Sequence, residues 1–226
     1  MRICLQRPSL VYQCAFDLCA VEVRRFDMPV IVLASGPFFA REVLKRLYGD
    51  VILYPTGDWD PESDEYGTEM GLEVRWDHVQ LATVGKASLP FGTAIWTEPQ
   101  RDDLSDVSDC LANALNREAQ VIGITSNWLR FMLPEWKETS RSPAQRPLGF
   151  AKTSWLLKRW GFRTQRCYGI QGPVSLAYGF LARLAAMAGR EDVADRLRAG
   201  MREGLLTERW PIHWTPVSVI SAQKGG

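Results

Sequence analysis

Glu98 is the residue of this 226-residue chain whose type and position best suit it to chemistry. It stands in Thr97-Glu98-Pro99, directly after the apolar run of residues 92–97, which we predict to be a strand. A carboxylate at the end of a strand can orient a substrate or accept a proton from it. It can equally hydrogen-bond the loop that follows, so the sequence leaves both roles open. Glu98 is the candidate catalytic residue.

Further carboxylates gather in residues 55–70, a loop without a basic residue. The six are Asp58, Asp60, Glu62, Asp64, Glu65 and Glu69. Such a loop is typically a solvated surface segment, but Asp58 and Asp60 come soon after a predicted strand at residues 51–54. Asp77 follows residues 72–76, whose alternating pattern predicts a half-buried strand near a sheet edge. Each of these acids is either a surface charge or a ligand contact.

The cysteines and histidines do not form a metal-binding pattern. The five cysteines are Cys4, Cys14, Cys19, Cys110 and Cys167. They contain no CxxC pair, and His78 and His213 stand far from any cysteine cluster. We therefore expect small buried thiols, with neither a disulfide framework nor a zinc site. Both histidines are expected to be structural or exposed.

Composition narrows the class of protein. The formal net charge of +1 argues against a dedicated nucleic-acid surface, because phosphate binding requires a basic excess. No apolar run is long enough to span a bilayer, and the N-terminus lacks the features of a signal peptide. We expect a cytoplasmic protein that binds a small-molecule substrate or a protein partner.

Strand-like and helix-like segments alternate along the chain, which predicts an α/β fold with a doubly wound, mainly parallel sheet. We expect a single domain over residues 1–226, with a helical extension at 1–27 and a helical cap inserted at 172–210. The extension contains a helix from Ser9 to about Arg25, which we expect on the outside of the domain. Further strands are predicted at 30–34, 121–125, 162–168 and 217–222, and helices at 38–48, 102–115, 151–160, 173–188 and 191–204.

In doubly wound sheets, ligands bind at the carboxyl ends of the strands, where the strand order reverses. The first strand-to-helix turn therefore carries candidate binding residues, and here it reads Ala34-Ser35-Gly36-Pro37-Phe38. Pro37 suits the first position of a helix. Ser35 and Gly36 are the candidates in this turn.

Three later segments carry a resemblance to a known family. They are Leu89-Pro90-Phe91, the helix-to-strand block of residues 156–169 with its Gly161-Phe162, and the closing residues 216–224. In order and content they resemble the class I S-adenosylmethionine-dependent methyltransferases, over residues 28–226. The resemblance implies a Rossmann-like sheet with the strand at 30–34 in its centre and an antiparallel last strand.

The resemblance also implies a cofactor and roles for the candidate residues. S-adenosylmethionine would be held by Ser35, Gly36, Asp58 and Asp77, and Glu98 would lie beside the position of methyl transfer. In this family little is needed from the protein beyond alignment of the reactants, because the sulfonium is already activated. The expected activity is methyl transfer to a small molecule, and an apolar acceptor would suit the helical cap.

The chain departs from the family pattern where the cofactor binds. Val32 replaces an acid, Ala34 and Phe38 replace glycines beside Gly36, and Pro55 replaces the acid that ends the second strand. We therefore expect weak or undetectable cofactor binding unless Asp58, Asp60 or Asp77 compensates. The alternative is a catalytically inactive relative that serves as a binding or scaffold subunit, and another nucleotide-binding protein of this fold is a third. The segment 173–204 is either a cap on the core, a lid over an apolar substrate or a contact for a partner.

Overall fold

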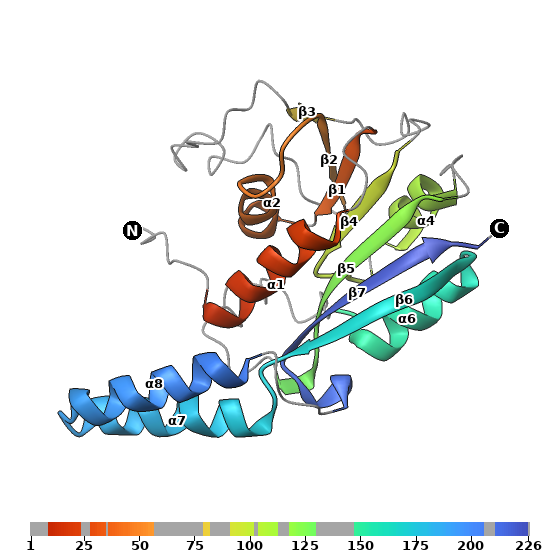
Figure 1. Cartoon of the computed structure of the whole chain (residues 1–226). Helices are drawn as coiled ribbons and strands as arrows, with labels where there is room; N and C mark the ends of the chain where they lie inside the picture. Colours follow the sequence, from red (N-terminus) through yellow and green to blue (C-terminus); the bar gives the residue numbers. More distant parts are fainter. Residues whose placement is uncertain are drawn as a thin grey trace.

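The computed structural model describes residues 9–23, 28–34, 36–56, 79–81, 91–101, 104–112, 118–129, 147–205 and 211–225. Within these ranges the chain forms a seven-stranded sheet in the order β3-β2-β1-β4-β5-β7-β6 (Figure 1). The strands are β1 (Val30–Ala34), β2 (Val51–Pro55), β3 (Val79–Leu81), β4 (Thr93–Thr97), β5 (Gln120–Ser126), β6 (Phe162–Ile170) and β7 (Val217–Lys224).

The predicted position of the first strand and direction of the last are both confirmed. β1 lies inside the sheet and pairs in parallel with β2 and β4. Every residue of β1 is buried, which is the pattern expected of a parallel strand that is covered on both faces. β7 runs antiparallel to both of its neighbours, β5 and β6. The chain therefore has a mainly parallel, Rossmann-like sheet.

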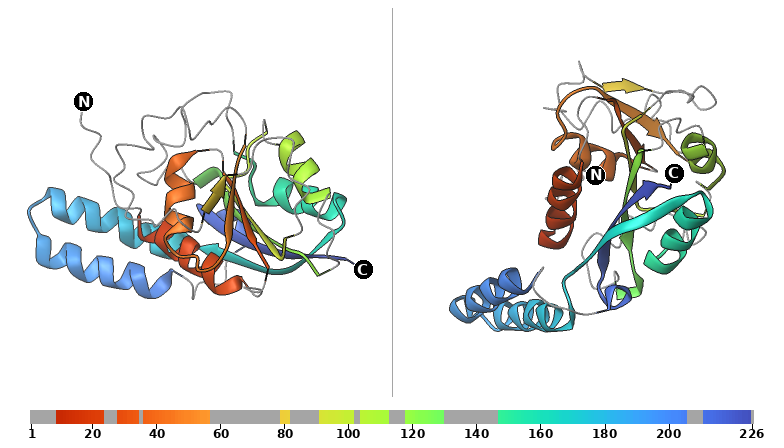
Figure 2. Two further views of the ribbon diagram at one scale, coloured as in Figure 1. Left: turned by 90° about the horizontal axis from the view of Figure 1, so that it is seen from above. Right: turned by 45° about the vertical axis from the view of Figure 1, so that its right-hand side comes forward.

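Helices cover both faces of the sheet (Figure 2). The helices α1 (Leu10–Glu22) and α2 (Pro37–Leu44) lie on one face, and α4 (Leu104–Ala112) and α6 (Phe150–Arg159) lie on the other. Alternate residues of β1 supply the two cores: Val30 and Val32 face the side of α1, whereas Ile31 and Leu33 face the side of α4 and α6. The period-two alternation of side chains along a strand gives this division.

The first helix packs against one face of the sheet, and its inner residues are part of the core. Tyr12, Ala15, Phe16 and Cys19 are almost completely buried against the sheet. Hydrogen bonds at Glu22 fix the C-terminal end of this helix. The Glu22 carbonyl accepts a hydrogen bond from Gln120 Nε2 at 2.9 Å, and its buried Oε1 accepts from Tyr168 at 2.7 Å and from Arg166 at 3.0 Å.

The predicted helices at 173–188 and 191–204 form a hairpin of α7 (Pro173–Met187) and α8 (Glu191–Gly204). The hairpin follows β6 and projects beyond the sheet in all three views (Figures 1 and 2). Small residues let the two helices approach closely: a Cβ at Gly179 would lie 3.0 Å from Met201 Sδ, and one at Gly200 would lie 3.5 Å from the Tyr178 ring.

The edge strand that the structure describes is not among the strands predicted from the sequence. The described edge strand is β3, Val79–Leu81, which pairs in parallel with β2. The alternating segment 72–76 that we predicted as an edge strand lies outside the described residues. In the ranges that the structure describes, no helix has the length and apolar character needed to cross a bilayer.

Candidate functional site

The register of the parallel strands brings their carboxyl ends to one edge. Ala34 of β1 is level with Pro55 of β2 and with Thr97 of β4. β5 runs further and ends at Ser126, after Ile124, which is level with Thr97. Residues that follow β2 and β4, and those that end β5, therefore share one edge of the sheet, the edge at which doubly wound folds bind ligands.

Glu98 occupies this edge in a strained and buried position. Its φ of 46° lies in the left-handed region, which residues with a side chain rarely adopt. Such a conformation costs on the order of 1–3 kcal/mol, persists only where the surroundings enforce it, and is found mainly at functional sites. The Glu98 amide donates to Ile124 O at 2.9 Å, and only 1% of the residue is exposed.

Two hydroxyl groups bind the Glu98 carboxylate from different parts of the chain. Tyr12 Oη, from α1, donates a hydrogen bond to Glu98 Oε1 at 2.8 Å. Ser126 Oγ, at the end of β5, donates to the same oxygen and lies 2.7 Å from Tyr12 Oη. The tyrosine and serine hydroxyls are thus the donors and the carboxylate oxygen is the acceptor. The three side chains form one buried polar group, the Tyr12–Glu98–Ser126 cluster.

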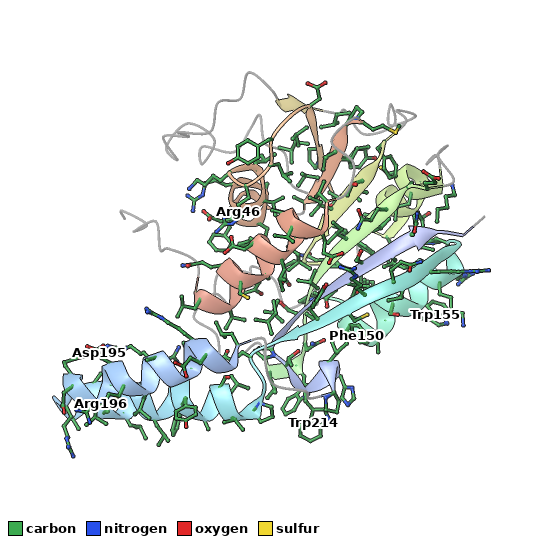
Figure 3. All side chains as sticks on the ribbon, viewed as in Figure 1. Arg46, Phe150, Trp155, Asp195, Arg196 and Trp214 are labelled. Carbon is green, nitrogen blue, oxygen red and sulfur yellow. The ribbon has the colours of Figure 1, made fainter. Side chains whose placement is uncertain are left out.

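Aromatic rings hold Tyr12 in this position. Its ring lies 5.3 Å from that of Phe39 on α2 and 6.0 Å from that of Phe16, between ring centroids. Phe16 is covered in turn by the guanidinium of Arg46, 5.4 Å from the ring centroid (Figure 3). Arg46 also forms an ion pair with Asp17 at 2.7 Å. The cluster is thus fixed from both α1 and α2.

The side chain of Asn127 connects the end of β5 to neighbouring segments, next to the Tyr12–Glu98–Ser126 cluster. Its Nδ2 donates to Thr215 O at 2.9 Å and to Ile212 O at 3.1 Å, and its Oδ1 accepts from the Phe150 amide at 3.0 Å. The amide side chain therefore joins β5 to α6 and to η3 (Ile212–Trp214). Beyond it, the exposed rings of Trp128 and Trp214 meet edge to face, 6.2 Å apart (Figure 3).

The other half of the edge lies at β1 and β2. Among the described residues, no atom lies within 4 Å of a Cβ placed at Gly36, so no described side chain fills the space beside its backbone. The Thr56 amide donates to Ala34 O at 2.9 Å, and its buried hydroxyl has no hydrogen-bond partner in the described part of the chain. Phe38, which replaces a family glycine, is half-buried and packs edge to face on Phe39, 5.1 Å away.

The structure brings together two of the five candidate site residues. Gly36 and Glu98 both lie at the carboxyl edge. Ser35, Asp58 and Asp77 lie outside the described residues, so their roles stay predictions. Three participants were missed: Tyr12 and Ser126, which bind Glu98, and Thr56, which follows Pro55. Tyr12 carries no sequence signal, because it is one of many apolar residues in its helix.

Two of the four described thiols are buried, as expected, and the other two are partly exposed. The four described cysteines, Cys14, Cys19, Cys110 and Cys167, are free, and Cys19 and Cys110 are buried. Burial raises the pKa of the Cys110 thiol to about 12 and raises the pKa of Cys19 as well. Both therefore stay protonated and unreactive at neutral pH. Cys4 is outside the described residues.

Comparison with known proteins gives a likeness in structure alone. No protein-family model matches the sequence, and no relative is found among curated proteins. Among solved structures, geranyl diphosphate C-methyltransferase from Streptomyces coelicolor A3(2) matches with a TM-score of 0.54 and 13% identity, over 94% of this chain and 80% of that chain. It was crystallised with Mg²⁺, geranyl diphosphate and S-adenosyl-L-homocysteine.

Two further structures match equally well. A geranyl diphosphate methyltransferase bound to its substrate and sinefungin gives a TM-score of 0.53 at 12% identity, over 93% of this chain and 78% of that chain. The [4+2]-cyclase SpnF gives 0.53 at 14% identity, over 94% and 80%. A methyltransferase and a cyclase in this group share one architecture, so the likeness identifies a fold and not a reaction. With its sheet order and antiparallel β7, the chain has the fold of the class I S-adenosylmethionine-dependent methyltransferases.

Proposed function

We propose that this protein binds S-adenosylmethionine at the carboxyl edge of its sheet and catalyses methyl transfer to a small, apolar molecule. The observation that carries the proposal is Glu98, a buried carboxylate in a left-handed backbone conformation at the end of β4. A strained, buried acid with two dedicated hydrogen-bond donors is costly for a fold to maintain, and such positions concentrate at functional sites. The structural neighbours described as methyltransferases support the choice of reaction.

The β1 and β2 half of the edge suits part of the cofactor. The space beside Gly36, which no described side chain fills, allows close approach of a ligand to the backbone before α2. The Thr56 hydroxyl supplies a polar atom just after Pro55, where the family uses an acid for the ribose hydroxyls. A neutral hydroxyl is a weaker partner than a carboxylate, because charge-assisted hydrogen bonds are roughly twice as strong. The residues fit the cofactor, with reduced affinity.

When bound, S-adenosylmethionine would supply an activated methyl group. In this proposal Glu98 orients the acceptor and takes the proton that the acceptor loses on methylation. Ser126 and Tyr12 both bind the carboxylate at Oε1, and in this proposal α1 shifts to let the acceptor reach Glu98. Trp128 and Trp214 form an exposed aromatic rim near the end of β5, which suits an apolar acceptor.

The test compares the wild type with Glu98→Gln, which keeps the shape of the side chain and removes its basicity. Each is incubated with methyl-labelled S-adenosylmethionine and a fractionated pool of small apolar metabolites, and label is followed into the organic phase. We expect transfer by the wild type and a loss of about 10²–10⁴-fold in the variant. Equal rates in the two proteins, or no transfer by the wild type to any fraction, would contradict the proposal.

A second function, a catalytically inactive binding or scaffold subunit, is favoured by the burial of Glu98. Tyr12 binds the carboxylate, and with 1% exposure Glu98 meets a ligand only if α1 shifts. Pro55 also stands where the family has an acid for the ribose hydroxyls, and this difference argues against catalysis. In this alternative the Tyr12–Glu98–Ser126 cluster stabilises the fold alone.

Tyr12→Ala opens the Glu98 carboxylate and, because Tyr12 is buried, lowers the stability of the fold under either function. If Glu98 is catalytic, the protein that remains folded still transfers label. If the cluster is only structural, neither the wild type nor the variant transfers label.

A further inference from the structure

The outer face of α7 is apolar and exposed. Its large exposed side chains are Val174, Phe180, Leu181, Leu184 and Met187, the last with 85% of its surface in contact with solvent, and Tyr178 at the border, whose ring also packs over Gly200 of α8. With Ala177 and Ala188, which are also exposed, they cover about half the circumference of the helix at 3.6 residues per turn. We call this surface the α7 face. Arg183, the one charge in α7, lies at its border.

The packing of α7 against α8 explains why this face remains outside. The opposite side of α7, with Ser175, Gly179 and Ala182, is turned inward, and Gly179 lies close to Met201 of α8. The hairpin projects from the end of β6, so the sheet covers little of it (Figures 1 and 2). A soluble helix with an apolar face turned to water is unusual and marks an interaction site.

The area of the α7 face matches one half of a stable interface. From their exposed fractions, the six large side chains present on the order of 600 Å² to solvent, the upper end of the patches found on monomers. Two such faces together would bury roughly 1,200 Å², the lower end of the range for specific protein–protein interfaces.

The spacing of the side chains indicates that the partner of the α7 face is the α7 helix of a second copy of this chain. Val174, Leu181 and Ala188 recur every seven residues, and Ala177 and Leu184 fall between them, which is the a and d pattern of a coiled-coil seam. In an antiparallel pairing about a two-fold axis, Leu181 of each copy faces Leu184 of the other. The pattern is therefore self-complementary, as an isologous dimer requires.

The charges also favour a protein surface over a lipid surface. The hairpin has five arginines and four carboxylates, so its net charge is only +1. Arg198 is paired with Asp195 at 2.7 Å and with Glu191 at 3.4 Å on α8, where Asp195 and Arg196 are marked in Figure 3. Helices that bind membranes from one side instead carry an excess of Lys and Arg beside the apolar face.

We infer that the α7 face is the dimer interface of this protein, in which the hairpins of two copies pack antiparallel into a four-helix bundle. No charge lies within the face, so the pairing buries no uncompensated ion. The packing of each α7 against its own α8 already fixes the hairpin, and little ordering is required on association. The inference is independent of the proposed enzymatic activity.

Sedimentation velocity of the full chain over a series of concentrations tests the inference. We expect a dimer for the wild type and a monomer for the double variant Leu181→Glu/Leu184→Glu, which places four charges in the seam of two copies. Both leucines are about half exposed, so the variant should keep the circular dichroism spectrum of the wild type. Val21→Glu is the matched control, because Val21 is an exposed apolar residue on α1, and it should remain dimeric.

Three results would overturn the inference. A wild type that stays monomeric at every concentration would exclude the interface, and a double variant that still dimerises would place the interface elsewhere. The third is a monomeric wild type that co-sediments with phosphatidylcholine/phosphatidylserine vesicles and is released by salt, which would make the α7 face a membrane contact.

Discussion

The hydroxyl of Tyr12 donates a hydrogen bond to Glu98 Oε1 at 2.8 Å, although the two residues are 86 positions apart. This contact joins the N-terminal helix to the edge of the sheet where β4 ends. It means that α1 is a part of the candidate site and also of the core, and that the position of this helix controls access to the Glu98 carboxylate.

Tyr12→Phe should lower the stability of the fold. The variant keeps the aromatic packing on Phe39 and removes the hydroxyl that binds a buried carboxylate. Hydrogen bonds to charged groups contribute about 1.5–3 kcal/mol, so we expect a decrease of that size in the free energy of unfolding, measured with urea. Tyr48→Phe is the control. Because Tyr48 is exposed, this variant should have the same free energy of unfolding as the wild type.

A glycine on β6 is required by close packing against the segment before β7. A Cβ at Gly169 would lie 2.8 Å from Thr215 Cγ2 and 3.1 Å from Thr215 Oγ1, both too close for an undisturbed contact. Gly169→Ala should therefore lower the free energy of unfolding by about 1–3 kcal/mol. Thr215→Ser in the same chain removes the closer atom and should restore part of the loss.

Gly123, on β5, is the control for the Gly169→Ala prediction, because it is also a glycine in the sheet. A Cβ there would meet Thr153 Cγ2 at 3.7 Å, an ordinary contact, so Gly123→Ala should be tolerated. A larger loss at Gly123 than at Gly169 would show that the packing around Thr215 is looser than described.

The strands β1, β2, β4 and β5 could be predicted from the sequence because their apolar runs are continuous, whereas the three-residue strand β3 could not. Val30–Ala34 is buried at every position, as its composition indicates, and α8 begins and ends at the predicted residues. The boundary between α7 and α8 follows from Gly189, whose positive φ of 72° ends the first of the two helices. Local signals of this kind are sufficient for element type and order.

The site was predictable only in part, because its contacts are long-range. Glu98 could be found from its place after a strand, and Gly36 from the turn after β1. Nothing in the sequence links Tyr12 to Glu98 or Ser126, because the sequence around a tyrosine in an apolar helix does not indicate its hydrogen-bond partner. The packing of α1 against the domain could be predicted from its apolar surface, but not the face of the sheet that it contacts.

Stability should fall in alkali because of the buried thiols. Their raised pKa values mean that Cys110 and Cys19 stay protonated in the folded state while they ionise in the unfolded chain. The stabilisation is complete below the ordinary thiol pKa of 9.0, and for Cys110 it is lost as the pH rises towards about 12. Each thiol should contribute a slope of about −1.4 kcal/mol per pH unit in that window.

Urea unfolding at a series of alkaline pH values measures this slope. Cys110→Ala removes one titrating group and should give a shallower decline than the wild type. A decline of the same steepness in both would show that Cys110 ionises equally in the folded and unfolded states.

Titration calorimetry of the full chain with S-adenosylmethionine and S-adenosylhomocysteine tests the account most directly. Under the proposed function, Pro55 lacks the carboxylate that the family places at the end of strand two and Pro37 lacks an amide hydrogen, and each loss would weaken cofactor binding by about 1.5–3 kcal/mol. We therefore predict weak but saturable binding, with a Kd of about 0.1–1 mM. Gly36→Ala should keep the fold, since its Cβ meets no described atom within 4 Å, and should weaken binding about tenfold. A folded protein that gives no saturable heat at millimolar ligand would contradict the account and leave the scaffold function in its place.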